Sequence, residues 1–160
     1  MTFASIAGHT RVRGLLAQAI ARETLPPTLL FTGPSGVGKW RVANAVAAAV
    51  NCLAPVRDQA GLPVDACGEC RSCDRIARGV HVDVVRIEPD DRASIKIDVI
   101  RDLVDRIGFR PFEGRRRFVL IREADALEPS AQNSLLKSLE EPPPATVFIL
   151  TTAVPGVLLS

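Results

Sequence analysis

Hydrophobic and polar positions along this chain follow two patterns that alternate from one end to the other. Short, nearly continuous apolar runs are typical of strands buried in a parallel sheet. Longer stretches with apolar residues at i, i+3, i+4 and i+7 predict amphipathic helices. The predicted strands are 28–32, 82–87, 117–121 and 146–151, and the predicted helices are 10–22, 39–51, 97–107 and 129–140. This order predicts an α/β fold in which helices cover both faces of a parallel sheet.

The helix predicted at 10–22 should begin at Thr10, whose hydroxyl can cap the first turn. Its apolar stripe is expected to face a core and consists of Val12, Leu15, Leu16, Ala19 and Ile20. Residues 54–65 instead combine Pro, Gly and Asp without any periodicity, and they predict a loop.

The length of 160 residues predicts one domain, 1–160, that is large enough to bury a substantial core. No apolar run approaches the roughly 20 residues of a membrane-spanning helix, and the N-terminus has no signal-peptide pattern. We therefore expect a cytoplasmic protein without a membrane partner. The net charge of +2 gives no reason by itself to expect nucleic-acid binding.

The segment between the first predicted strand and the second predicted helix has the pattern of a phosphate-binding loop, Gly-x-x-x-x-Gly-Lys. Its candidate phosphate-binding residues are Gly33, Pro34, Ser35, Gly36, Val37, Gly38, Lys39 and Trp40. Backbone N–H groups, the helix N-terminus and the Lys39 ammonium would together attract phosphates. Such a match can also be an ordinary glycine turn, but the flanking strand and helix favour the phosphate-binding loop.

Two positions that normally hold Mg²⁺ in such a site carry unsuitable residues. The residue after the lysine should be Ser or Thr but is Trp40, and Arg122 stands after a strand where an aspartate is expected. Glu123 remains a candidate to position the attacking water. The two losses argue against Mg²⁺ and metal-assisted hydrolysis, while binding of ATP or ADP stays open. The simpler alternative is that Arg122 forms a surface salt bridge with Glu123 or Asp125.

The four cysteines of the chain are clustered, and three of them have Cys-x-x-Cys-x-x-Cys spacing. They are Cys52, Cys67, Cys70 and Cys73. This spacing suits a metal ion better than disulfides, so we expect one structural Zn²⁺ held by four thiolates. Four reduced cysteines, or a redox pair, are the alternatives. His81 could also ligate, but four sulfurs complete a tetrahedral site without it.

Two other features have simpler explanations than a functional one. His9 is expected to enter the first helix rather than to act in catalysis. The run Arg115, Arg116 and Arg117 could touch a phosphate backbone, but a solvated turn before a strand is the commoner explanation.

Several segments together resemble the AAA+ subunits of bacterial clamp loaders, and the resemblance covers essentially the whole chain. The most specific is 131–143, since these subunits carry Asn-x-Leu-Leu-Lys-x-Leu-Glu-Glu-Pro-Pro there. Residues 3–8 resemble the family's adenine-side entry segment, and 67–73 resemble its inserted zinc module. Three segments are most similar to the delta-prime type of subunit, although a valine replaces a proline in the first: 79–83, 97–101 and 110–115.

The resemblance implies an AAA+ nucleotide-site domain with a zinc module, 52–73, inserted in it, and lid and collar domains beyond residue 160. It implies a subunit of the DNA polymerase III holoenzyme that helps to load the sliding clamp onto primed DNA. Its partners would be the gamma/tau and delta subunits, the clamp and, through the complex, the primed DNA. Arg122 and Glu123 would form a degenerate Walker B motif, and Thr152 would stand at the sensor position.

Delta-prime subunits commonly have degraded Mg²⁺ positions, so the implied role is that of a stator without ATPase activity. The alternative is an active ATPase, either a gamma/tau-like motor or another P-loop NTPase. A third reading, a zinc-dependent DNA-binding module, is weakened by the nearly neutral charge.

Overall fold

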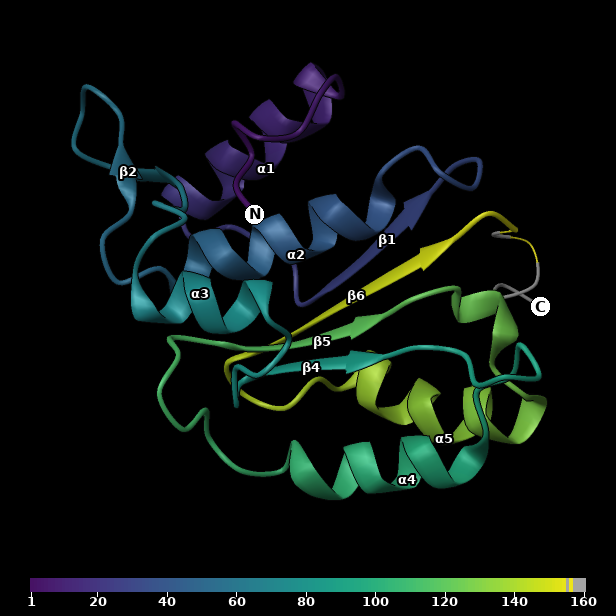
Figure 1. Ribbon diagram of the computed structural model, residues 1–160. Helices are drawn as coiled ribbons and strands as arrows, with labels where there is room; N and C mark the ends of the chain where they lie inside the picture. The colour runs from purple at the N-terminus through teal and green to yellow at the C-terminus, as the bar shows by residue number, and fades with distance from the viewer. Residues whose placement is uncertain (155, 157–160) are drawn as a thin grey trace.

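A four-stranded parallel sheet forms the centre of the fold in the computed structural model, which describes residues 1–154 and 156 (Figure 1). The strand order is β1-β6-β5-β4. The strands are β1 (Thr28–Thr32), β4 (Val84–Ile87), β5 (Arg117–Ile121) and β6 (Thr146–Thr152). Every residue of β5 and β6 is buried, because these strands lie between the edge strands β1 and β4.

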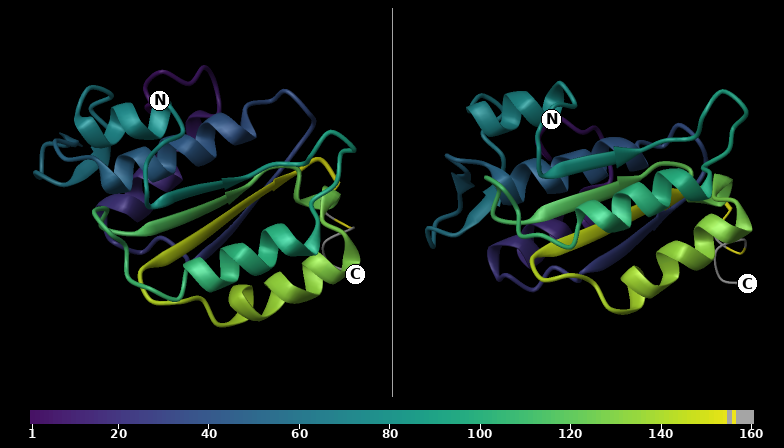
Figure 2. Two further views of the ribbon diagram at one scale, coloured as in Figure 1. Left: turned by 60° about the horizontal axis from the view of Figure 1, so that its bottom comes forward. Right: turned by 90° about the horizontal axis from the view of Figure 1, so that it is seen from below.

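Helices cover both faces of this sheet, as Figures 1 and 2 show. One face carries α1 (Thr10–Ala21), α2 (Lys39–Asn51) and α3 (Arg71–Ala77), and the other carries α4 (Ile97–Arg106) and α5 (Pro129–Glu140). Phe118 belongs to the core under α2, whereas its neighbour Val119 belongs to the core under α4 and α5, as expected for alternating strand positions. The predicted α/β architecture is confirmed. Within the described residues, no helix has the length and apolarity to cross a membrane.

The start and the buried face of α1 differ from the prediction. His9, in the left-handed conformation, is the N-cap, and Thr10 is already the first helical residue. Leu16 and Ile20 are buried, but Val12 is 43% exposed and Leu15 is 57% exposed. The apolar stripe is therefore wider than the face that packs, because α1 lies at the rim of its layer.

The segment predicted as a loop contains a small antiparallel hairpin, β2 (Val56–Arg57) and β3 (Pro63–Asp65). Asp58 stabilises its turn, since one carboxylate oxygen accepts hydrogen bonds from the N–H groups of Ala60 and Leu62, each 2.9 Å long. Strands this short leave no periodicity to detect, which is why the loop prediction was wrong. Helix α3 is too short to have been predicted for the same reason.

Candidate functional site

The predicted phosphate-binding loop lies at the C-terminal ends of the strands, where it forms one wall of a cleft of about 390 Å³. Lys39 and Trp40 line that wall. The opposite wall carries Arg122, Asp125 and Thr152, which follow or end β5 and β6. The fold thus brings the loop and the candidate residues after β5 together, although more than 80 residues separate them in the sequence.

The backbone of the loop has the conformation that its glycines predict. Gly36 and Gly38 have φ angles of 83° and 100°, a region that residues with a side chain rarely adopt. Lys39 Nζ donates hydrogen bonds to the carbonyl oxygens of Gly33 and Pro34, so its ammonium lies folded over the loop. The loop therefore has the two features that phosphate binding requires, a curved backbone and a nearby ammonium group, that of Lys39.

His9 contacts this loop, which adds to its expected role at the start of α1. Its Nε2 donates to the carbonyl oxygen of Val37 over 2.6 Å. The segment before α1 is thereby fastened to the phosphate-binding loop.

Trp40 and Arg122, the two residues at the expected Mg²⁺ positions, contact each other. The guanidinium carbon of Arg122 lies 5.8 Å from the centroid of the Trp40 ring, within the range of a cation–π interaction. Arg122 Nη1 also lies 3.1 Å from Glu88 Oε1. A positive charge thus stands on the strand end that normally presents the Mg²⁺ carboxylate.

The simpler alternative was therefore right that Arg122 forms a surface salt bridge but wrong about the partner, which is Glu88 and not Glu123 or Asp125. The reason is the register of the sheet: Ile87 of β4 pairs with Ile121 of β5, so the next residues, Glu88 and Arg122, leave the two strands side by side. The register depends on which strands become neighbours, and the sequence around Arg122 does not contain that information.

The remaining candidates near Arg122 have different environments. Glu123 is exposed, with its backbone in the left-handed conformation at a φ angle of 52°. Thr152, the residue at the expected sensor position, is buried and donates its hydroxyl to Asp125 Oδ1 over 2.7 Å. The same hydroxyl oxygen accepts a hydrogen bond from the N–H of Val154 over 3.0 Å. Thr152 is thus held by protein groups, whereas the Glu123 carboxylate faces solvent.

The four cysteines come together at the other end of α2, and their sulfur atoms all lie within 4.8 Å of one another. The Cys52 and Cys70 sulfurs are 3.9 Å apart, and those of Cys67 and Cys73 are 4.0 Å apart. Four ligands at about 2.3 Å from a tetrahedral Zn²⁺ would be about 3.8 Å from each other. The arrangement fits a metal ion such as zinc and confirms that these residues form one cluster.

Backbone N–H groups surround the cluster and favour thiolates. Partial burial raises the pKa of Cys70, but hydrogen bonds to its sulfur, chiefly from the N–H groups of Cys73 and Leu53, outweigh this effect and lower the pKa to about 6. Burial raises the pKa of Cys73 above its ordinary value. The lowered pKa of Cys70, together with the spacing of the four sulfurs, is compatible with a metal site.

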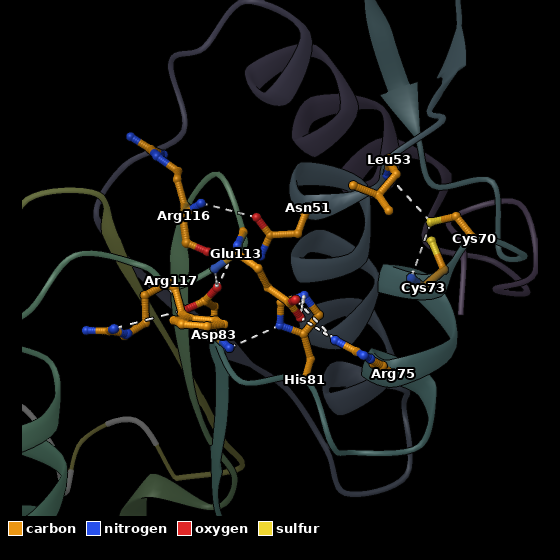
Figure 3. A network of polar contacts seen from close by, with 12 residues as sticks. Asn51, Leu53, Cys70, Cys73, Arg75, His81, Asp83, Glu113, Arg116 and Arg117 are labelled. Atoms are coloured by element: carbon orange, nitrogen blue, oxygen red, sulfur yellow. Dashed lines mark hydrogen bonds and ion pairs between the residues drawn. The ribbon is translucent and has the colours of Figure 1, made fainter.

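A buried polar network, which the sequence did not predict, lies beside the cysteine cluster (Figure 3). Its centre is Asp83, whose carboxylate accepts hydrogen bonds of 2.5 to 2.7 Å from the N–H groups of Phe112, Glu113 and Gly114. Burial raises the pKa of Asp83, but these donors outweigh it, so the pKa of the carboxyl lies below its ordinary value. The loop before β5 is thereby fixed to the start of β4.

Two other side chains connect this loop to the cysteine cluster (Figure 3). Arg75 of α3 donates to both carboxylate oxygens of Glu113, over 2.9 and 3.1 Å. Asn51, the last residue of α2, bonds both the N–H and the carbonyl group of Arg116. Because Cys52 directly follows Asn51, the segment that carries one of the thiols also holds this loop.

His81 belongs to this network and not to the cysteine cluster. Its Nδ1 accepts a hydrogen bond of 3.0 Å from the N–H of Asp83, and its Nε2 lies 3.7 Å from Glu113 Oε1. Burial lowers the pKa of His81 below its ordinary value. The sequence signals for this network were the runs 79–83 and 110–115, both of which the clamp-loader resemblance had singled out without indicating that they contact each other.

The run of three arginines before β5 divides into different environments. Arg117 is buried and donates to the carbonyl oxygens of Arg106, Phe109 and Arg110, so it has a structural role. Arg115 is exposed and is free to face solvent, which agrees with the solvated-turn interpretation for that residue.

Comparison with known proteins gives a consistent set of relatives. Residues 8–160 match the protein family described as "DNA polymerase III, delta subunit". The chain is 40% identical over 148 residues to DNA polymerase III subunit delta' of Pseudomonas aeruginosa, covering 92% of this chain and 43% of that protein. It is 35% identical over 157 residues to DNA polymerase III subunit tau of Escherichia coli, covering 98% of this chain and 23% of that protein.

A third relative is DNA polymerase III subunit tau/gamma of Haemophilus influenzae, 34% identical over 157 residues, with coverage of 98% of this chain and 22% of that protein. The chain therefore spans about a fifth to two fifths of the length of these relatives. Among solved structures, a DNA polymerase III gamma subunit-related protein of Thermotoga maritima superposes with a TM-score of 0.57 at 20% identity, covering 91% of this chain and 40% of that chain. This likeness shows the same fold.

Proposed function

The chain belongs to the DNA polymerase III delta-subunit family, within the AAA+ clamp-loader proteins, and from that premise we propose that it is a delta-prime subunit that does not hydrolyse ATP. In this role it is a rigid stator of the ring that opens the sliding clamp and places it on primed DNA. Its partners are the gamma/tau and delta subunits, and the assembly works in the cytoplasm.

The contact between Trp40 and Arg122 is the observation that carries this proposal. Tryptophan offers no oxygen to Mg²⁺, and a guanidinium beside the same position repels the ion. Without the ion, nothing neutralises the charge that develops on the phosphates in the transition state. The loop and Lys39 can still hold phosphates, so any nucleotide binding is expected to be indifferent to Mg²⁺.

The cysteine cluster supports the second part of the proposal, a structural Zn²⁺ held by Cys52, Cys67, Cys70 and Cys73. The ion would join the end of α2 to the N-terminal turn of α3, and would make 52–73 a module anchored to the main fold. It would supply a cross-link, which is the usual contribution of a four-thiolate zinc site.

A gamma/tau-like ATPase motor is the competing function, because two of the three relatives named above are tau or tau/gamma subunits. A motor needs the Ser or Thr and the Asp that Trp40 and Arg122 replace. The identity of 40% to a delta' subunit, against 34% and 35% to the other two, also favours the stator.

Reconstitution of the clamp loader separates the two functions. The full-length protein should form a complex with gamma/tau and delta subunits and support ATP-dependent clamp loading. Lys39→Ala in this chain should leave the ATP turnover of the complex unchanged, whereas the matching lysine substitution in gamma/tau should abolish it. Failure to assemble with these subunits would contradict the delta-prime assignment. Loss of turnover on Lys39→Ala would identify a motor.

A further inference from the structure

A second and larger cleft, of about 830 Å³, lies at the opposite end of the sheet from the phosphate-binding loop. It is bounded by the end of α1, the end of α2, the β2–β3 hairpin and the loop that leads into β5. Apolar residues form part of its lining, including Ile20, Leu25, Val50 and Leu62. Its charged residues are Arg22, Arg57, Arg115, Arg116 and Glu23.

The charges of this cleft do not balance. Four arginines line it against the single carboxylate of Glu23, in a chain whose net charge is only +2. Within the described part of the chain, the arginines that form ion pairs are Arg75, Arg78, Arg117 and Arg122, and none of these lines the cleft. Like charges gathered on a concave surface raise the positive potential there and attract a polyanion.

The side chain of one of these arginines and the backbone of another are held in place. Arg57 Nη1 donates to the carbonyl oxygen of Gly61 over 2.9 Å, which ties the guanidinium to the hairpin. The backbone of Arg116 is bonded on both sides by the Asn51 amide, over 2.9 and 3.1 Å. A ligand therefore meets cations on elements that are already ordered, which lowers the entropy cost of binding.

We propose that this arginine cleft binds the phosphate backbone of single-stranded nucleic acid. Guanidinium groups match phosphate oxygens in a two-pronged geometry, and the apolar lining suits sugars and bases between the phosphates. A single strand can enter a concave cleft, whereas a duplex, a wide convex rod, meets only its rim. The chain belongs to a family of DNA polymerase subunits, so a nucleic-acid strand is the polyanion that we expect it to meet. The proposal is independent of nucleotide binding at the other end of the sheet.

Fluorescence anisotropy with a labelled 12-nucleotide oligothymidylate and the full-length protein tests this proposal. Each phosphate contact contributes about −0.7 to the slope of log K against log salt concentration for a single strand, so removing two contacts should flatten the slope by about 1.4. The double variant Arg22→Ala/Arg115→Ala should therefore bind about tenfold more weakly at low salt and depend less steeply on salt concentration. Both side chains are exposed, so the melting temperature should stay unchanged.

The matched control is Arg92→Ala/Arg101→Ala, which removes the same charge from exposed positions outside the cleft. It should retain the affinity and salt slope of the unaltered protein. The proposal is overturned if the cleft variant binds like the unaltered protein, or if the control loses as much. Displacement of the oligonucleotide by polyglutamate at equal charge concentration would identify an acidic protein segment as the ligand instead, and would also overturn it.

Discussion

The two ends of α2 carry the two places where a clamp-loader domain of this type could hold a metal ion, and they differ completely. At the C-terminal end, four sulfur atoms lie within 4.8 Å of one another, with N–H groups directed at them. At the N-terminal end, Trp40 and Arg122, which we propose to stand at the Mg²⁺ positions, contact each other. One end is arranged to receive a cation, and the other already contains the positive charge of an arginine.

This difference shows that the shape of a phosphate-binding loop and the capacity to hydrolyse ATP depend on different residues. The shape of the phosphate-binding loop depends on glycine backbone angles and on the strand and helix around it, and all of these are present. In the proposed function, the capacity to hydrolyse ATP depends on the two side chains at positions 40 and 122, and the fold is intact with Trp40 and Arg122 there. In the cysteine cluster, by contrast, the same four residues would both bind the metal ion and hold the local fold together.

The largest effect is expected from Cys73→Ala, which removes one of the four thiolates. Zinc content should fall from about one ion per chain to none, and the melting temperature should fall by about 10 °C or more, because metal binding contributes directly to folding. Plasma emission spectrometry and a thermal melt measure both quantities. If the unaltered protein holds no zinc after purification without chelators, the two ends of α2 do not differ as described.

The neighbouring substitution Ser72→Ala is the matched control for that experiment. The Ser72 hydroxyl is buried and has no hydrogen-bond partner among the described groups. Its removal should leave the zinc content unchanged and the stability equal or slightly higher. A loss of zinc in this variant would show that the measurement reports general damage to α3.

A smaller effect is expected from Asp83→Asn, which tests the network beside the cysteine cluster. An amide cannot accept three hydrogen bonds as a carboxylate does, so the free energy of unfolding should fall by about 3 kcal/mol at pH 7. Because the folded-state pKa of Asp83 is lowered, its stabilisation is present above the unfolded value of about 4 and is lost as the pH falls through the folded value.

Denaturant titrations of both proteins at neutral and acidic pH measure this prediction. The difference in unfolding free energy should shrink as the pH falls below about 4. The control is Asp74→Asn, since Asp74 forms an exposed pair with Arg78 over 3.4 Å and should contribute little. A difference that is independent of pH would show that the carboxylate charge is not what stabilises the loop.

The smallest effect on stability is expected from Arg122→Ala at the other end of α2. A cation–π contact and an exposed salt bridge together should contribute less than about 1 kcal/mol. Trp40 is the only tryptophan of the chain, so its fluorescence reports this contact directly. The spectrum should change in Arg122→Ala and stay unchanged in the control Arg101→Ala. An unchanged spectrum in both would mean that the two residues do not touch in solution.

How much the sequence predicted depends on how local each feature is. The strand 117–121, the helix 39–51 and the thiol spacing were predicted because their patterns are complete within a few turns of chain. The pairing of Arg122 with Glu88 depends on the register of β4 and β5, and therefore could not be predicted. The same holds for Asp83, whose partners lie about 30 residues further along the chain.

Calorimetry with ATP and ADP, each with Mg²⁺ and with EDTA, tests the central claim most directly when a turnover assay accompanies it. The claim is that Trp40 and Arg122 have removed the Mg²⁺ site while leaving the phosphate-binding loop in place. The predicted result is no measurable ATP hydrolysis, and either no binding or binding whose affinity is the same with Mg²⁺ as with EDTA. Tight binding that requires Mg²⁺, together with turnover, would contradict the account and restore the ATPase motor.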